Sequence, residues 1–166
     1  MRRIVDITSV ALIAFLAACS KAPSASSPLA GPGTEATNSC PVTEPINAVP
    51  PPDPNAESFG RFEAGPWYIN ADRTIWAGWD AVRMVAGPKG NKVLWIRPWG
   101  TQLTVSGRRL DAQAPPPTAY IPCCYSTGFQ ASGLTFPTEG CWEMSAKAGN
   151  SRLTFVTRVG PEPPAR

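Results

Sequence analysis

Regular alternation of apolar and polar residues near the C-terminus constrains the fold of this chain more than any other feature. In residues 141–147, "CWEMSAK", and again in residues 152–159, "RLTFVTRV", apolar side chains recur at about every second position. Successive side chains of a β-strand point to opposite faces of its sheet, so each run is expected to be a strand with one apolar face. Gly149 and Asn150 between the runs suit the positive φ angles of a tight hairpin turn. The pattern predicts a half-buried hairpin whose apolar face carries Trp142, Met144, Ala146, Leu153, Phe155 and Val159.

Short apolar runs separated by turn residues extend this pattern back along the chain to about residue 58. No stretch of ten or more residues carries the apolar stripe of a helix, and no internal repeat is visible. Many short strands with turn signals between them are typical of an all-β sandwich or barrel. Besides the hairpin, strands are expected near residues 67–69, 74–79, 82–85, 92–99, 103–109, 118–123 and 129–136.

Three segments carry a wider resemblance: "LTVSGRRLDA", "STGFQASGLTFPTEGCWEM" and "SRLTFVTRV". They resemble a family of uncharacterised secreted bacterial proteins with an immunoglobulin-like β-sandwich, over about residues 92–159. The resemblance implies an immunoglobulin-like antiparallel sandwich in which "FPTEGCWEM" brings Cys141 into the body of the domain. Trp142 directly follows this cysteine, unlike the antibody arrangement, so the antibody disulfide geometry is not transferred. Because a fold does not determine an activity, the resemblance implies no function.

The N-terminus has the layout of a secretory signal peptide. Residues 1–18 begin with a basic pair and continue with an apolar run that ends in small residues. This run is about half the ~20 residues that a transmembrane helix needs. Residues 16–19, "LAAC", resemble the lipobox of bacterial lipoproteins, which implies that Cys19 is acylated and becomes the first residue of the mature protein. The alternative is an ordinary signal peptide cleaved nearby, without lipid on Cys19. Ser20 after the cysteine resembles an outer-membrane sorting signal.

The remaining chain divides into four parts. Residues 19–39 are rich in Ser, Ala, Pro and Gly and are expected to form a disordered tether. Residues 40–57 are dense in proline and are expected to be ordered only by lying across the domain. Residues 58–160 are predicted to form the β-sandwich, and residues 161–166 a disordered tail.

The chain contains no histidine, and this absence restricts its chemistry. Histidine is the commonest general base and the commonest metal ligand, and it activates most serine and cysteine nucleophiles. A formal net charge of +3 without a basic block gives no electrostatic footprint for nucleic acid. We therefore expect a protein that is not an enzyme, has no cofactor and binds no nucleic acid.

The carboxylates also fail to suggest a hydrolase. Glu139 and Glu143 would lie about 13 Å apart if both belonged to one strand. Glycoside hydrolysis needs a carboxyl pair ~5 to 9.5 Å apart. In "GRRLD", residues 107–111, an Arg–Asp ion pair at a strand end is expected, and a substrate clamp is the alternative.

Four cysteines remain once Cys19 is acylated: Cys40, Cys123, Cys124 and Cys141. An even number in an oxidising compartment indicates disulfides, and four cysteines allow three connectivities. Neighbouring cysteines rarely bond each other, which favours the two crossed arrangements. However, a Cys40–Cys141 bond would staple the proline-rich segment to the domain and close a loop of roughly 100 residues, worth up to ~4.7 kcal/mol. We favour this bond, which leaves Cys123 and Cys124 as a vicinal disulfide or as thiols.

A soft-metal site is the functional alternative for these sulfur atoms. Thiolate and thioether ligands select Cu(I), whereas zinc is disfavoured without histidine or a Cys-x-x-Cys pair. The ligands would come from Cys123, Cys124, Cys141 and either Met84 or Met144.

The segment "KVLWIRPWG" suggests a ligand platform. On one strand, Trp95, Arg97 and Trp99 would share a face, and an arginine between two indoles suits the recognition of sugars or peptides. The alternative is that a second sheet, or prolines 50–54, cover these rings.

Taken together, these features predict a membrane-anchored lipoprotein of the bacterial envelope, facing the periplasm or cell surface, in the outer membrane where there are two. The expected role is a non-catalytic binding or envelope-maintenance module for an envelope protein, peptide or glycan. The alternative is a thiol or Cu(I)-binding module centred on Cys123 and Cys124.

Overall fold

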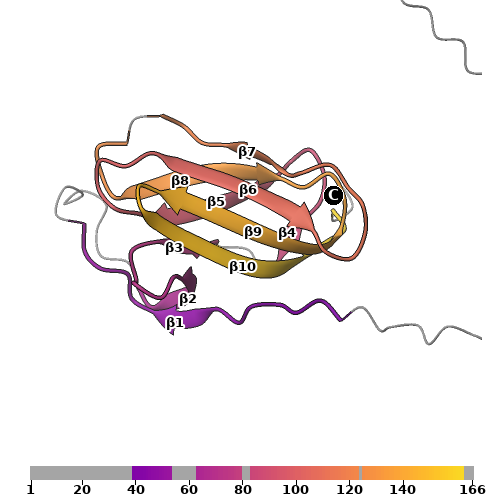
Figure 1. The fold of residues 1–166 in the computed structure, drawn as a ribbon, viewed down its shortest axis with the longest axis horizontal. Helices are drawn as coiled ribbons and strands as arrows, with labels where there is room; N and C mark the ends of the chain where they lie inside the picture. The colour runs from indigo at the N-terminus through magenta and orange to yellow at the C-terminus, as the bar shows by residue number, and fades with distance from the viewer. Residues whose placement is uncertain (1–38, 54–62, 80–82, 124, 163–166) are drawn as a thin grey trace, which may run out of the picture. The chain divides into compact units, whose positions relative to one another are not determined.

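The computed structural model describes residues 39–53, 63–79, 83–123 and 125–162. This part of the chain contains ten β-strands and no helix. Figure 1 shows the strands in two stacked layers, so the predicted fold class, an all-β sandwich, is confirmed. The predicted signal peptide, the acylation site Cys19, the tether up to residue 38 and Cys124 lie outside the described residues. No helix long and apolar enough to cross a membrane occurs in the part of the chain that was searched, the described residues.

The first sheet has six strands, each antiparallel to its neighbours. In order across the sheet they are β1 (Ile46–Ala48), β2 (Gly65–Ile69), β3 (Trp76–Gly78), β5 (Asn91–Ile96), β8 (Phe129–Thr135) and β7 (Thr118–Tyr120). The second sheet has four strands in the order β4 (Met84–Val85), β10 (Ser151–Gly160), β9 (Gly140–Ala148) and β6 (Leu103–Arg109).

One strand pair, and the isolated bridge between Ala86 and Phe136, depart from the antiparallel arrangement that the resemblance implied. β4 lies parallel to the end of β10, with Met84 opposite Val159. β4 is a two-residue edge strand, and the chain reaches it from β3 and leaves it for β5, both in the other sheet.

The β9–β10 hairpin forms as its alternation predicts. Ala148 pairs with Ser151, which leaves Gly149 and Asn150 as a two-residue loop. Gly149 has a φ of 58°, and Asn150 is not among the residues with positive φ. Glycine at the first central position is the pattern of a type II′ turn, whose twist matches that of the strands. The predicted apolar face is buried, namely Trp142, Met144, Ala146, Leu153, Phe155 and Val159.

The core lies between the two sheets and is rich in aromatic side chains. Phe136 packs edge-on against Trp142, with ring centroids 5.4 Å apart. Burying a large apolar side chain contributes about 1.5–3 kcal/mol, so this layer is the main source of stability. The largest side chains that are fully buried include Trp95, Trp142, Phe136, Phe155, Met84, Leu134, Met144, Val93 and Val159.

The proline-dense segment takes a larger part in the fold than the sequence indicated. The sandwich was expected to begin at residue 58, but β1 already pairs with β2 as the edge of the first sheet. Prolines are confined to sheet edges because they cannot donate to a ladder, and β1 is a proline-free triplet between Pro45 and Pro50. We call residues 40–48 the strap.

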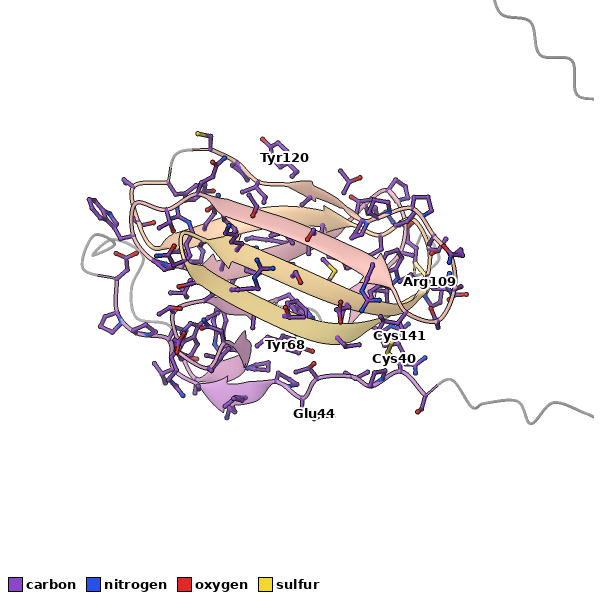
Figure 2. The ribbon with its side chains drawn as sticks, viewed as in Figure 1. Cys40, Glu44, Tyr68, Arg109, Tyr120 and Cys141 are labelled. Carbon is purple, nitrogen blue, oxygen red and sulfur yellow. A yellow bond between two sulfur atoms is a disulfide. The ribbon has the colours of Figure 1, made fainter. Side chains whose placement is uncertain are left out.

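The strap is fastened to the second sheet at two places. Cys40 and Cys141 form a disulfide with Cα atoms 5.4 Å apart, which confirms the favoured pairing. Three residues further on, the Thr43 N–H donates to the Val156 carbonyl at 2.9 Å, and the Thr43 hydroxyl accepts from the Val156 N–H at 2.9 Å. Figure 2 shows the strap running from this disulfide along the lower side of the sandwich, past Glu44. It therefore bridges the two sheets at one lateral edge.

Candidate functional site

Arg97, predicted to belong to a ligand platform, and Cys123, predicted to belong to a vicinal disulfide or thiol pair, come together at one end of the sandwich. Arg97 directly follows β5, and Cys123 lies in the connection between β7 and β8. Both line a cavity of about 380 Å³, which we call the end pocket. This volume falls within the range of small-molecule sites in proteins, about 300–1,000 Å³. The described residues that line it are Arg97, Gly100, Thr101, Gln102, Leu103, Ile121, Pro122, Cys123, Tyr125 and Gln130.

Arg97 is the charged group of the end pocket, and its side chain is buried, with 6% of the residue exposed. Its Nε donates to Gln130 Oε1 at 2.7 Å. Its Nη1 donates to the Pro98 carbonyl at 3.2 Å, and Nη2 to the Tyr125 carbonyl at 3.3 Å. A guanidinium has five N–H donors, so these three bonds to uncharged oxygens leave donors for a further acceptor.

Burial lowers the pKa of the Arg97 guanidinium, and the negative charge of Asp53 opposes this effect. An arginine keeps its proton in proteins, so the group remains a buried cation. Burying a charge is costly unless it is paired, and the hydrogen bonds of Arg97 go to neutral groups. Asp53 offsets part of this charge from the side of a neighbouring hollow, whereas no carboxylate is among the described residues that line the end pocket, so a ligand there would meet the guanidinium as the charged group.

The neighbours of Arg97 hold it in place. Gln130 on β8 is buried, and its Nε2 donates to the Pro122 carbonyl at 2.8 Å, so this side chain links Arg97 to the β7–β8 connection. Asp53 accepts hydrogen bonds from the Gly128 and Phe129 N–H groups. A Cβ at Gly128 would lie 2.8 Å from the Arg97 carbonyl oxygen, so only glycine permits this approach of the connection to β5.

The predicted platform of two indoles around Arg97 is wrong with respect to Trp95. Trp95 is 0% exposed, and its Nε1 donates to Ser132 Oγ at 2.7 Å. β5 is a central strand, and the second sheet covers its inner face, which was the alternative given for this segment. Trp95 therefore belongs to the core and cannot contact a ligand.

Trp99 has a different environment because Pro98 ends the strand before it. Trp99 is 66% exposed, and its Nε1 donates to the Ser126 carbonyl at 2.6 Å. Pro51 and Pro52 lie beside it and share with Trp99 and Arg97 a shallow hollow of about 150 Å³. The prolines therefore flank the ring without covering it, and Trp99 is an exposed aromatic surface next to Arg97.

The sulfur atoms offer less to a metal than the sequence suggested. Cys141 is bonded to Cys40, and Cys123 is also part of a disulfide. A sulfur atom in a disulfide is not a thiolate, and the thiolate is the form that binds metals. Within the described ranges, no group of three or more His, Cys, Asp or Glu side chains could hold a metal ion.

The ion pair expected in residues 107–111 forms at the opposite end of β6. Arg109 Nε lies 2.6 Å from Asp111 Oδ1, and Asp111 Oδ2 accepts from the Cys141 N–H at 3.1 Å. The hydrogen bond from Arg109 lowers the pKa of the Asp111 carboxyl, and the Cys141 N–H adds to this, while burial opposes it. Arg109 and Cys141 lie together at the same end of the sandwich in Figure 2. The pair fixes the start of β9 beside the disulfide, which is a structural role.

Comparison with known proteins adds no relative: no family model, curated protein or solved structure matches the chain. The site is therefore interpreted from its own residues. Sequence reasoning missed Gln130, Tyr125 and Asp53, because each joins the site through a contact with a residue at least 28 positions away. The end pocket is suited to binding a ligand, because a buried guanidinium lines the cavity and an exposed indole lies beside it.

Proposed function

We propose that this chain is a lipid-anchored protein of the bacterial envelope that binds a carboxylate-bearing envelope ligand at the end pocket and does not catalyse a reaction. The observation that carries the proposal is the buried guanidinium of Arg97, hydrogen-bonded to uncharged oxygens in the wall of a 380 Å³ cavity. Charge-assisted bonds from arginine to carboxylates are roughly twice as strong as bonds between neutral groups. A carboxylate in the end pocket would neutralise the cation and use its remaining donors.

The exposed indole of Trp99 supports the same assignment. Aromatic rings contribute apolar area to binding with little loss of conformational freedom, and they accept the apolar faces of sugars and peptides. Arg97 lines both the end pocket and the shallow hollow, which Trp99 and Asp53 also line, so a ligand that extends from the pocket past Arg97 can reach the indole. Both a peptide and a glycan can carry this combination of a carboxylate and an apolar face.

Membrane attachment rests on the sequence alone. The "LAAC" segment ending at Cys19 resembles a lipobox, and Ser20 resembles an outer-membrane sorting signal. Several acyl chains on one cysteine are a stable anchor, whereas a single chain is not. Twenty residues separate Cys19 from Cys40, and a flexible chain of that length spans about 25 Å on average. The sandwich would thus be held near the membrane and remain able to reach ligands.

A binding role rather than catalysis is supported by the composition of the site. The chain has no histidine, and no carboxylate is found among the described residues that line the end pocket. The pocket presents an arginine, amides, hydroxyls and a bonded sulfur, which suit recognition better than proton transfer.

Binding is tested by calorimetric titration of the lipoprotein in detergent micelles with soluble peptidoglycan fragments, which carry free carboxylates. The proposal predicts saturable binding that methyl esterification of the fragments abolishes. Arg97→Lys keeps the charge but loses the planar fork of donors, so we expect at least tenfold weaker binding. Lys92→Gln removes an exposed charge from the other end of β5 and is the matched control. Equal binding of native and esterified fragments would refute a carboxylate site.

Attachment is tested by mass analysis of the N-terminal peptide from purified membranes. An acylated Cys19 at the first position is the expected result, and Cys19→Ala should release the protein from the membrane fraction. An intact, unmodified Cys19 in the mature protein would contradict the anchor.

A further inference from the structure

A second hollow, of about 330 Å³, lies at the lateral edge that the strap bridges. One wall comes from β2 and the end of β3, the opposite wall from β10, and the strap closes it with Val42 and Pro45. We call this hollow the edge groove. Figure 2 shows Tyr68 between β10 and the part of the strap that carries Glu44. The described residues that line it are Val42, Pro45, Pro66, Tyr68, Trp79, Arg83, Thr157 and Arg158.

The floor of the edge groove is aromatic and continuous with the core. Tyr68 stacks against Phe155, with ring centroids 4.3 Å apart, and against Trp79, 5.1 Å apart. Phe155 is fully buried in the core, whereas Trp79 is only half-buried. The partly exposed indole therefore rests on a packed layer of rings and is held in position before any ligand arrives.

Two arginines at this groove have no counter-charge that the structure describes. Arg83 and Arg158 are both exposed, and the side chain of neither forms an ion pair or a hydrogen bond among the described residues. By contrast, Arg108 and Arg109 are paired with carboxylates. Glu44 is the acid whose charge acts on Tyr68, so among the described residues two cations line the groove and one anion lies near it. The excess positive charge favours an anionic ligand.

The groove offers few main-chain groups to a ligand. Pro45 and Pro66 have no N–H, and the outer edge of β10 is already occupied by Thr43 at Val156 and by β4 at Val159 and Gly160. A peptide bound by main-chain hydrogen bonds needs an open strand edge. A ligand in this groove is instead recognised through ring stacking and through arginine side chains.

We propose that the edge groove binds an acidic sugar residue of a glycan, with the ring on Trp79 and the carboxylate paired with Arg83 and Arg158. The C–H face of a sugar ring is apolar and flat enough to pack against an indole. A uronic acid adds the carboxylate that two guanidinium groups recognise by paired, charge-assisted hydrogen bonds. The strap wall is held by the Cys40–Cys141 disulfide, so the groove is preformed on this side.

Titration of the full-length lipoprotein in micelles with trigalacturonate tests the proposal, with neutral galactotriose and triglutamate as comparison ligands. Trigalacturonate should bind saturably and at least tenfold more tightly than either comparison ligand. Equal affinity for triglutamate would overturn the sugar assignment in favour of an acidic peptide. Equal affinity for galactotriose would overturn the role of the arginines.

Two sets of variants locate the binding. The double variant Arg83→Gln/Arg158→Gln should weaken trigalacturonate binding at least tenfold, while Lys92→Gln/Arg152→Gln, which removes two exposed charges elsewhere, should change it less than twofold. All four substitutions are at exposed positions, so folding is retained and is checked by thermal unfolding. Arg97→Gln should leave this binding within twofold. Loss of binding in Arg97→Gln alone would place the sugar in the end pocket and overturn the edge groove without refuting the proposed function.

Discussion

The sulfur atoms of Cys40 and Cys141 are bonded across 101 positions of sequence. The bond joins the start of the strap to the start of β9, beside the Arg109–Asp111 pair. The strap then continues through Thr43 to β1 at the far edge of the first sheet. One covalent link thereby secures both the connection between the sheets and one wall of the edge groove.

Removal of this disulfide should destabilise the sandwich. Closing a loop of about 100 residues restricts the unfolded chain, and losing a native disulfide typically costs about 2–5 kcal/mol. We expect Cys40→Ala/Cys141→Ala to lower the free energy of unfolding by that amount, measured by urea titration. Reductant would also break the disulfide of Cys123, so the double variant, and not reduction of the wild type, tests the Cys40–Cys141 bond alone. Adding reductant to the double variant then measures the effect of the second disulfide. An unchanged urea midpoint would contradict the stabilising role of the strap.

The Arg109–Asp111 pair should make stability depend on acid pH. The pKa of the Asp111 carboxyl in the folded protein lies below its ordinary value. Asp111 therefore stabilises the fold at pH values above the pKa of the unfolded chain, about 3.9. This contribution is lost as the pH falls through the lower pKa of the folded state. The difference in urea midpoint between wild type and Asp111→Asn should be constant near neutral pH and shrink below about pH 4. A difference that stays constant down to pH 2 would rule out this linkage.

Gly128 should be intolerant of a side chain. A Cβ there would lie 2.8 Å from the Arg97 carbonyl oxygen and 3.0 Å from Asp53 Oδ2, and overpacking of this kind costs about 1–3 kcal/mol. Gly128→Ala should therefore lower both stability and ligand affinity at the end pocket. Gly133→Ala in β8 is the matched control, because its nearest neighbour would be Tyr120 Cβ at an ordinary 3.8 Å. Equal stability of the two variants would contradict the close approach.

Trp95 and Trp99 should differ in their accessibility to a fluorescence quencher and in their contribution to stability. Trp99→Phe should remove the indole most accessible to acrylamide quenching and change the free energy of unfolding by less than about 0.5 kcal/mol. Trp95→Phe should leave quenching unchanged and lower stability by more than about 1 kcal/mol, since it creates a cavity and removes the bond to Ser132. The reverse pattern would show that the two environments are misassigned.

The extent to which sequence predicted this fold depends on how local each signal is. β6 and the β9–β10 hairpin follow from alternation within single runs, and the predicted bounds 103–109 match Leu103–Arg109. β1 was missed because its three residues carry no alternation and its neighbours are prolines. The Cys40–Cys141 bond was favoured only by an argument about loop length. Pro98 is a local signal that Trp99 lies beyond the strand, but no short-range pattern predicts the burial of Trp95, because it depends on which strands cover β5.

The candidate site was also predictable only in part, because most of its contacts join residues that lie far apart in the sequence. The sequence singled out Arg97, Trp99 and Cys123, and their proximity follows from the pairing of β5 with β8. The edge groove has no local sequence signal at all. Its rings and arginines come from β2, β10 and the segments beside β3 and β4, which only the sandwich brings together.

The most direct test of the central claim is NMR observation of the Arg97 guanidinium in the ¹⁵N-labelled protein during titration with soluble peptidoglycan fragments. The account predicts that the Arg97 Nη signals shift saturably, in step with the Trp99 indole N–H, while the Trp95 indole N–H stays in place. Esterified fragments should produce no such shift. Saturable binding that leaves the Arg97 signals unchanged would contradict the claim that the end pocket is a carboxylate site.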